Sequence, residues 1–194
     1  MLKINKVAEP DFLKVYKKRY NPKNWDDYNE DHIKFELKTY IAENEQSIND
    51  VRLCVYCERE IDIANNKGHI EHIKPKEKFP QFFQEYENLS ISCDSHGTCG
   101  HAKQNKYDDR FINPVEDKPN DFLAYDDLTG EIIAKDISVK DRVDYTVNEV
   151  LKLNEYTLCK ARKILFKQLG FIKNPEEFES IVSYYKGFST LVNY

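Results

Sequence analysis

Four of the five cysteines in this 194-residue chain form two pairs whose spacing suggests metal binding. Cys54 and Cys57 make a C-x-x-C pair, and Cys93 and Cys99 make a second pair with a wider gap. Two such pairs can supply the four thiolate ligands of a tetrahedral structural zinc ion. Because the second gap exceeds the usual spacing, His96, which lies within it, could replace Cys93 or Cys99. We expect zinc, and the alternative is a set of buried thiols that bind no metal.

A glutamate and a histidine, Glu71 and His72, stand side by side between the two cysteine pairs. Hydrolysis of a phosphodiester needs a base that activates water and a divalent cation that stabilises negative charge. A neutral histidine suits the first task, and a carboxylate suits the second because Mg²⁺ and Mn²⁺ prefer oxygen ligands. Alternation along a strand places His69 and Glu71 on one face and His72 on the other. Glu71 and His72 can therefore serve one ion only if the backbone twists or a further ligand comes from the flank.

The elements predicted around these residues are two strands and a short helix. Residues 68–73 and 88–93 have strand composition, and a helix is expected to begin at Cys99. This order of strand, loop, strand and helix is the ββα arrangement that a metal-dependent nuclease site needs. Two further strands are predicted upstream, over residues 52–56 and 58–63.

Helical segments are predicted on both sides of this central part. Helices are expected over 11–20, 28–46 and 141–169, the last broken near Asn154, and over 175–188, with a hairpin over 122–135. The expected fold class is α+β, with a ββα core, a zinc site and flanking helices. The predicted division is an N-terminal helical segment at 1–50, the core and hairpin at 51–136, and a C-terminal helical region at 137–194. Trp25 is expected to pack inward and Cys159 to be a small core residue. His32 is expected to be a surface or satisfied residue, and His69 a peripheral or substrate-side residue with a structural role.

Composition restricts the setting in which such a site would act. No apolar run approaches the roughly 20 residues needed to cross a bilayer, and the first residues lack the apolar core of a signal peptide. An odd number of cysteines fits a reducing compartment better than a disulfide framework. We therefore expect a cytoplasmic protein without membrane contact.

A net charge of -5 is unusual for a chain that neutralises many phosphates, so nucleic-acid binding would need a partner or a local basic strip. Such a strip is offered by Lys74, Lys76, Lys78, Lys103 and Lys106.

Several stretches resemble the HNH, or ββα-metal, endonuclease family, and more narrowly its Septu-type branch, which also occurs as an effector with some retrons. The matching pieces are spread over most of the chain. They are the N-terminal EP and WDDY, then LCVYCE, HIEHIKPK, ENLSISC, CGHAK, FINP, and LKLNEYTL with Arg162 downstream. The resemblance implies a metal-dependent endonuclease that serves anti-phage defence.

The resemblance also implies a role for each matching residue. His72 would be the general base, Glu71 an acidic ligand of a catalytic Mg²⁺ or Mn²⁺, and Asn88 would order the loop and the histidine. The four cysteines would be the structural zinc ligands.

The chain departs from the family pattern at the third ligand of the catalytic metal. That ligand usually follows the last cysteine directly, but the residue there is Gly100. His101, one residue later, is the predicted ligand, with His96 in reserve. The lysines predicted to contact the substrate are Lys74, Lys76 and Lys103.

Three classes of function are compatible with these residues. The first is an endonuclease with DNA as the expected substrate, RNA (including transfer RNA) as the alternative, and a PtuA-like ATPase as partner in a hetero-oligomeric complex. The second is a non-catalytic zinc module, which would have no need of Glu71 and His72. The third, a redox protein that uses Cys54 and Cys57, is disfavoured because no βαβ pattern follows the pair.

Overall fold

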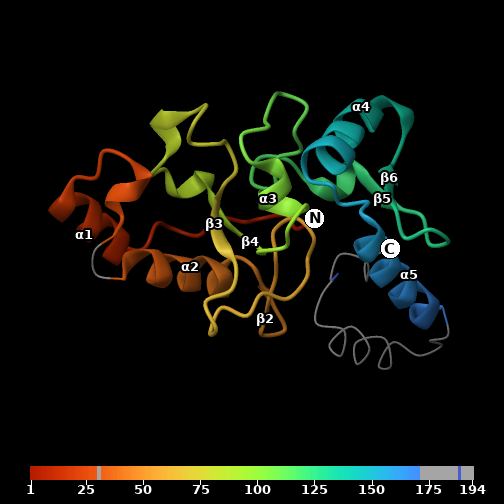
Figure 1. Ribbon diagram of the computed structural model, residues 1–194, viewed down its shortest axis with the longest axis horizontal. Coiled ribbons are helices and arrows are strands. Elements are labelled where there is room, and N and C mark those ends of the chain that lie inside the picture. Colours follow the sequence, from red (N-terminus) through yellow and green to blue (C-terminus); the bar gives the residue numbers. More distant parts are fainter. Residues whose placement is uncertain (30–31, 171–187, 189–194) are drawn as a thin grey trace.

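The computed structural model of this chain describes residues 1–29, 32–170 and 188. Within these residues the protein is a mixed α and β fold in which the strands form three separate two-stranded sheets (Figure 1). Helices lie at both ends of the molecule, and a short strand pair occupies its middle (Figure 1). None of the described helices is long and apolar enough to span a bilayer.

Two helices form the N-terminal part. Helix α1 (Asp11–Tyr20) has an acidic residue in its first turn and three basic residues in its last, which complements the helix dipole. Helix α2 (Ile33–Asn44) buries Ile33, Leu37 and Ile41 against the core. It begins later than the predicted residue 28, because residues Trp25–Asp27 form a separate 3-10 turn capped by Asn24.

The middle of the fold has the predicted order of strand, loop, strand and helix. Strand β3 (His69–His72) pairs antiparallel with β4 (Leu89–Ser92), with Glu71 opposite Ser90 and His72 opposite Leu89. Helix α3 (Cys99–Lys103) follows β4. These three elements carry most of the residues to which the sequence assigns chemistry.

The strand predicted over 52–56 is wrong for most of its length. Only a short hairpin forms, between β1 (Ser47–Ile48) and β2 (Val51–Arg52), and Leu53 makes a single bridge to Glu60. The chain then turns, and the amide of Glu58 donates to the carbonyl of Cys54 at 3.0 Å. A C-x-x-C pair has to curl in this way for both sulfurs to reach one point, which an extended strand with alternating side chains cannot do. The strand predicted over 58–63 is reduced to the same bridge.

The C-terminal part follows the prediction closely. Strands β5 (Leu123–Tyr125) and β6 (Ile132–Ala134) form the expected hairpin. Helix α4 (Lys140–Val143) continues into a π-helical segment, Asp144–Val150, and helix α5 (Tyr156–Leu169) begins after the predicted break. The helix predicted over 175–188 lies outside the described residues apart from Phe188.

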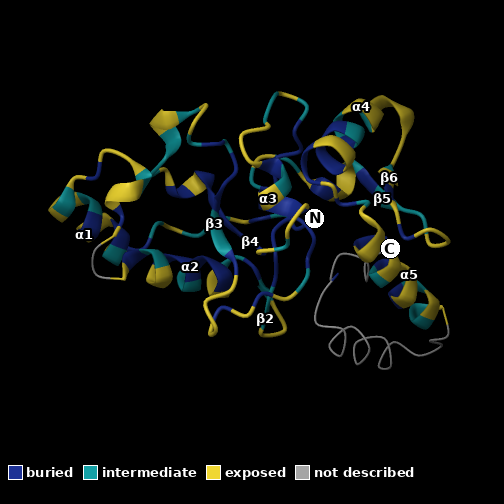
Figure 2. Ribbon diagram, in the orientation of Figure 1, coloured by how far each residue is buried: buried dark blue, intermediate teal, exposed yellow. Residues whose placement is uncertain are grey.

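One buried core connects these parts. It runs from Met1 to Leu158 and so includes residues from all three predicted segments, whose boundaries stay predictions (Figure 2). Arg162 is 1% exposed and donates to the carbonyls of Gly130 at 2.6 Å and Leu153 at 2.7 Å. A single guanidinium thus satisfies main-chain acceptors from the β5–β6 turn and from the break before α5.

Candidate functional site

The four predicted zinc ligands come together in the interior. The sulfurs of Cys54, Cys57, Cys93 and Cys99 all lie within 4.8 Å of one another, and all four residues are buried. Cys57 Sγ and Cys93 Sγ are 3.8 Å apart, far longer than a disulfide bond of about 2.05 Å. Two sulfurs bound at about 2.3 Å to one tetrahedral ion stand about 3.8 Å apart. The cluster therefore fits a structural metal such as zinc, and His96 is not needed to replace a cysteine.

Main-chain hydrogen bonds hold the ligands from three sides. The amide of Val55, inside the first pair, donates to the carbonyl of Ile91 in β4 at 3.0 Å. The amide of Cys93 points at Cys54 Sγ at 3.3 Å. Cys99, at the start of α3, donates its amide to the carbonyl of Leu151 at 2.8 Å. The β4 strand and the segment that follows the π-helix therefore fix the positions of the sulfurs.

The four buried thiols shift one another's pKa values. Burial raises the pKa of the Cys54 thiol, and hydrogen bonds to the other sulfurs raise the pKa of Cys99. Hydrogen bonds from the other thiols lower the pKa of Cys93 instead. Without a metal the cluster keeps some of its protons, and a dication such as Zn²⁺ would allow all four groups to be thiolates.

The carboxylate of Glu71 lies in the interior between β3 and α3. Lys103 Nζ is 2.8 Å from Glu71 Oε1, and the hydroxyl of Tyr56 donates to the same oxygen at 3.1 Å. Burial by itself would raise the pKa of Glu71, but the charge of Lys103 and hydrogen bonds from His69 and Lys103 lower this pKa to about 2. Glu71 is therefore an anion at neutral pH, as a metal ligand must be.

His72 points to the opposite face of the strand. Its ring packs in a T-shaped arrangement against the ring of Trp25, with centroids 4.6 Å apart. Nε2 lies 2.9 Å from the carbonyl oxygen of Phe83. Because a carbonyl can only accept, Nε2 carries the proton, which leaves Nδ1 as the basic nitrogen of the neutral ring. Burial lowers the pKa of His72, so the ring is neutral at pH 7. Glu71 and His72 thus diverge, as strand alternation predicts, and do not share one face.

Asn88 fastens the loop between the two strands. Its side-chain oxygen accepts from the amide of Lys74 at 2.7 Å, and its Nδ2 donates to the carbonyls of Lys74 at 3.0 Å and Phe82 at 3.2 Å. The loop so anchored supplies the Phe83 carbonyl that fixes His72. This placement agrees with the loop-ordering role that the family resemblance implies, and that role stays a prediction.

A second cluster of possible ligands lies next to Glu71. His69, Asp94 and His101 each offer a ligand atom within 4.8 Å of the others. His69 Nδ1 is 3.1 Å from Asp94 Oδ1, and His101 Nε2 is 4.0 Å from the same oxygen. The ring of His96 is 5.3 Å from that of His101. His101 therefore belongs to the cluster and His96 lies beside it, and no hydrogen bond or ion pair among the described residues joins either histidine to Glu71.

The three lysines predicted to contact the substrate differ in their surroundings. Lys103 is 1% exposed, so it is not a solvated helix residue, and its ammonium also donates to the carbonyl of His72 at 2.9 Å. Lys74 pairs with Glu116 at 2.6 Å, and Lys76 pairs with Glu77 at 3.3 Å. A phosphate contact from Lys103 would require its pairing with Glu71 to open, whereas Lys74 and Lys76 lie nearer the solvent.

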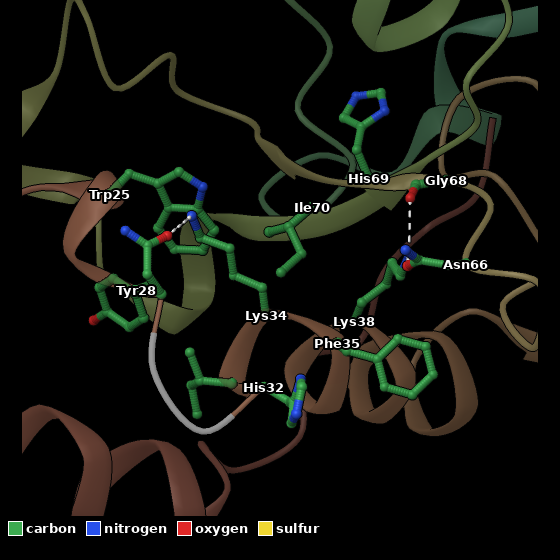
Figure 3. Close-up of a pocket in the computed structure, with 12 residues that line it drawn as sticks. Trp25, Tyr28, His32, Lys34, Phe35, Lys38, Asn66, Gly68, His69 and Ile70 are labelled. Carbon is green, nitrogen blue, oxygen red and sulfur yellow. Dashed lines mark hydrogen bonds between the residues drawn. The ribbon is translucent and has the colours of Figure 1, made fainter.

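A cleft of about 430 Å³ opens between α2 and β3, and Figure 3 shows its lining. Trp25 borders it and meets His72 with its ring. Ile70 points from β3 toward α2, while the ring of His69 points away from that helix (Figure 3). The picture thus shows His69 and Ile70 on opposite faces of β3.

Sequence reasoning missed the groups that position Glu71 and His72. Tyr56 lies 15 residues from Glu71 and the Phe83 carbonyl lies 11 residues from His72. Trp25, which packs against His72, was assigned only a packing role. No local pattern identifies them, because each contact depends on how β3 packs against its neighbours. Only the position of Tyr56 between two metal-ligand cysteines could have suggested that it lies near the site.

Replacing Lys103 by methionine is expected to destabilise the protein by about 3 kcal/mol, because it leaves the buried carboxylate of Glu71 without its counter-charge. Methionine keeps the length of the side chain, so the lost interaction is electrostatic. Urea unfolding of the two proteins measures the difference. The control is Lys106→Met, which removes an exposed lysine from the same segment and should change stability by less than about 0.5 kcal/mol. Equal stability of Lys103→Met and wild type would mean that the pair contributes nothing.

Comparison with known proteins identifies a distant relative. The chain is 27% identical over 143 residues to Septu protein PtuB of Bacillus thuringiensis, an alignment that covers 72% of this chain. The chain spans about half of the length of that relative, 50%. No family model matches the sequence. The chain is therefore similar to a Septu protein, at an identity that leaves its activity to be argued from the site.

Proposed function

We propose that this chain is a metal-dependent endonuclease that hydrolyses phosphodiester bonds, with DNA as its expected substrate, in a Septu-type anti-phage system. The proposal rests on one observation above all. A histidine whose Nε2 is fixed by a main-chain carbonyl adjoins a buried, ionised glutamate at the end of β3. These are the base and the metal ligand that phosphodiester hydrolysis needs.

His72 and Glu71 would act from opposite faces of β3, His72 as the general base and Glu71 as the metal ligand. Nδ1 of His72 would take a proton from water as the water oxygen attacks phosphorus and the bond to the leaving oxygen breaks. Glu71 would hold a divalent cation, which supplies positive charge to the phosphate when bound. Because β3 ends at His72, a phosphodiester lying across this end of the strand can reach both faces. Lys74 and Lys76 lie in the loop that follows and would contact neighbouring phosphates.

The burial of His72 suggests that the site is covered until substrate or a partner arrives. The residue is 7% exposed, and Trp25 packs against its ring. A net charge of -5 gives the whole chain little attraction for nucleic acid. Both features agree with a PtuA-like ATPase that delivers the substrate in a hetero-oligomeric complex, as the resemblance to Septu proteins implies.

A cleavage assay with and without a PtuA-like ATPase tests the proposal. We expect cleavage of plasmid DNA when Mg²⁺ or Mn²⁺ is added, and none when both ions are left out, because the catalytic ion is then missing while the structural zinc stays bound. The same assay on transfer RNA and other RNA distinguishes the alternative of a retron-linked RNA nuclease. A protein that holds zinc, binds the ATPase and cleaves neither polymer would instead be a non-catalytic zinc module.

A further inference from the structure

Gly100 lets the main chain of α3 approach two donor atoms closely. A Cβ built on Gly100 would lie 2.6 Å from Glu71 Oε2, 2.6 Å from His69 Nε2 and 3.0 Å from Ser92 Oγ. Carbon atoms in contact normally stand about 3.5 Å or more apart, so any side chain at this position would collide with both donors. The carboxylate oxygen and the ring nitrogen therefore border the volume that the missing side chain would fill.

The separation of the two donors suits a shared metal ion. Glu71 Oε2 and His69 Nε2 are 3.5 Å apart, longer than a good hydrogen bond between nitrogen and oxygen. Two ligand atoms at about 2.1 Å from one ion stand about 3.0 to 3.4 Å apart. Only a small closing movement would give both atoms their bonding distance.

The other polar atoms of both residues already have partners. Oε1 of Glu71 accepts from Lys103 and Tyr56, which leaves Oε2 to face His69. Nδ1 of His69 lies 3.1 Å from Asp94 Oδ1, so Asp94 can accept the Nδ1 proton. Without a metal Nε2 faces Glu71 Oε2 as a donor, and a bound ion would replace that proton at Nε2. A carboxylate that receives the second N–H of a histidine is the usual outer partner of a metal-bound imidazole.

We propose that His69 Nε2 and Glu71 Oε2, which meet beside Gly100, together bind a divalent transition-metal ion, with Asp94 orienting His69. For its role in cleavage this ion rests on the proposed function, in which Glu71 is already a ligand. The inference adds His69 as the second ligand, in place of the side chain that Gly100 lacks. A mixed nitrogen and oxygen site favours Mn²⁺ and later transition metals over Mg²⁺, which prefers oxygen ligands alone.

His101 is the competing ligand. Its Nε2 approaches Asp94 at 4.0 Å, and its ring is 5.1 Å from that of His69. A site built on His101 would use Asp94 as a ligand, and His69 would contribute through Nδ1. The two arrangements therefore differ in which histidine is indispensable and in whether Gly100 matters.

Binding of Mn²⁺ to the full chain with zinc in place, followed by the electron paramagnetic resonance signal of free Mn²⁺, tests the inference without any substrate. We expect wild type to bind Mn²⁺ more tightly than it binds Mg²⁺ in competition. His69→Ala, His69→Gln and Gly100→Ala should each weaken Mn²⁺ binding at least about tenfold, the loss that disturbing even an outer partner of a metal ligand can cause. His101→Ala should bind Mn²⁺ as wild type does. Zinc content and circular dichroism verify that each variant is folded.

Two results would overturn the inference: Mn²⁺ binding that survives both His69 substitutions, or binding that is lost in His101→Ala. Cleavage is scored separately. Activity together with unchanged Mn²⁺ affinity in His69→Ala would reject His69 as a ligand and leave the nuclease proposal standing. Mn²⁺ binding that depends on His69, in a protein that cleaves no nucleic acid, would support the site and reject the nuclease.

Discussion

Replacing His72 by glutamine is expected to lower the rate of nucleic-acid cleavage at least about a hundredfold, since general base catalysis contributes roughly 10²–10⁴. The amide N–H of glutamine can still donate to the Phe83 carbonyl that His72 contacts at 2.9 Å. The amide oxygen has no useful basicity near neutral pH, so the substitution removes the proton acceptor and keeps the anchor. Single-turnover cleavage with Mn²⁺ measures the effect.

The interpretation of that result depends on a folded protein. The His72→Gln protein should keep its zinc and its melting temperature to within a few degrees, because the substitution preserves a donor at a buried position. His32→Gln, which changes an exposed histidine at the start of α2, is the control and should cleave as wild type does. Full activity in His72→Gln would mean that a group other than His72 acts as the general base.

Removal of zinc is expected to unfold the protein at physiological temperature. A four-cysteine site contributes about 10–16 kcal/mol of apparent binding free energy, and a domain of this size has a total stability of only about 5–15 kcal/mol. Cys57→Ser should therefore lose both the metal and the cooperative thermal transition. Zinc analysis and circular dichroism melts on the same sample measure the two effects.

Cys159 provides the matched control for that substitution. It is the one cysteine outside the cluster, it is buried, and its sulfur lies 3.5 Å from the Arg162 guanidinium. Cys159→Ser should keep one zinc per chain and lose about 1 kcal/mol of stability at most. A Cys57→Ser protein that melts like wild type would show that the four sulfurs do not hold a structural metal.

The parts of the fold that sequence could predict are those set by local periodicity. Apolar spacing found α1, α2 and the broken C-terminal helix, and alternation found β3, β4 and the β5–β6 hairpin. The same alternation correctly placed Glu71 and His72 on opposite faces of β3. The strand predicted at 52–56 was wrong because the chain must turn around Cys54 for the sulfurs of Cys54 and Cys57 to reach one point. This requirement outweighs the strand propensity of the residues.

Tertiary packing decided the rest of the candidate site. A lysine in the last turn of a short helix is normally exposed to solvent. Lys103 is nevertheless buried, because Glu71 faces it from β3. The placement of His69 beside Gly100 depends on how α3 approaches β3, which no spacing along the chain reveals. The family pattern therefore directed attention to His101, which lies one residue from the expected position. The proximity of His69 to Glu71 and Gly100 appears only in the three-dimensional structure.

The spread of the four sulfurs along the chain has a consequence for biosynthesis. After Cys54 and Cys57 have emerged from the ribosome, more than thirty further residues must be added before Cys99 emerges. Leu151, whose carbonyl accepts the hydrogen bond from the Cys99 amide, is synthesised later still. Translation at about 5–20 residues per second leaves the nascent polypeptide without its complete thiolate set for seconds. The four-cysteine site therefore cannot be completed on a short nascent chain, and any activity that depends on this site begins only after Cys99 and Leu151 have been synthesised.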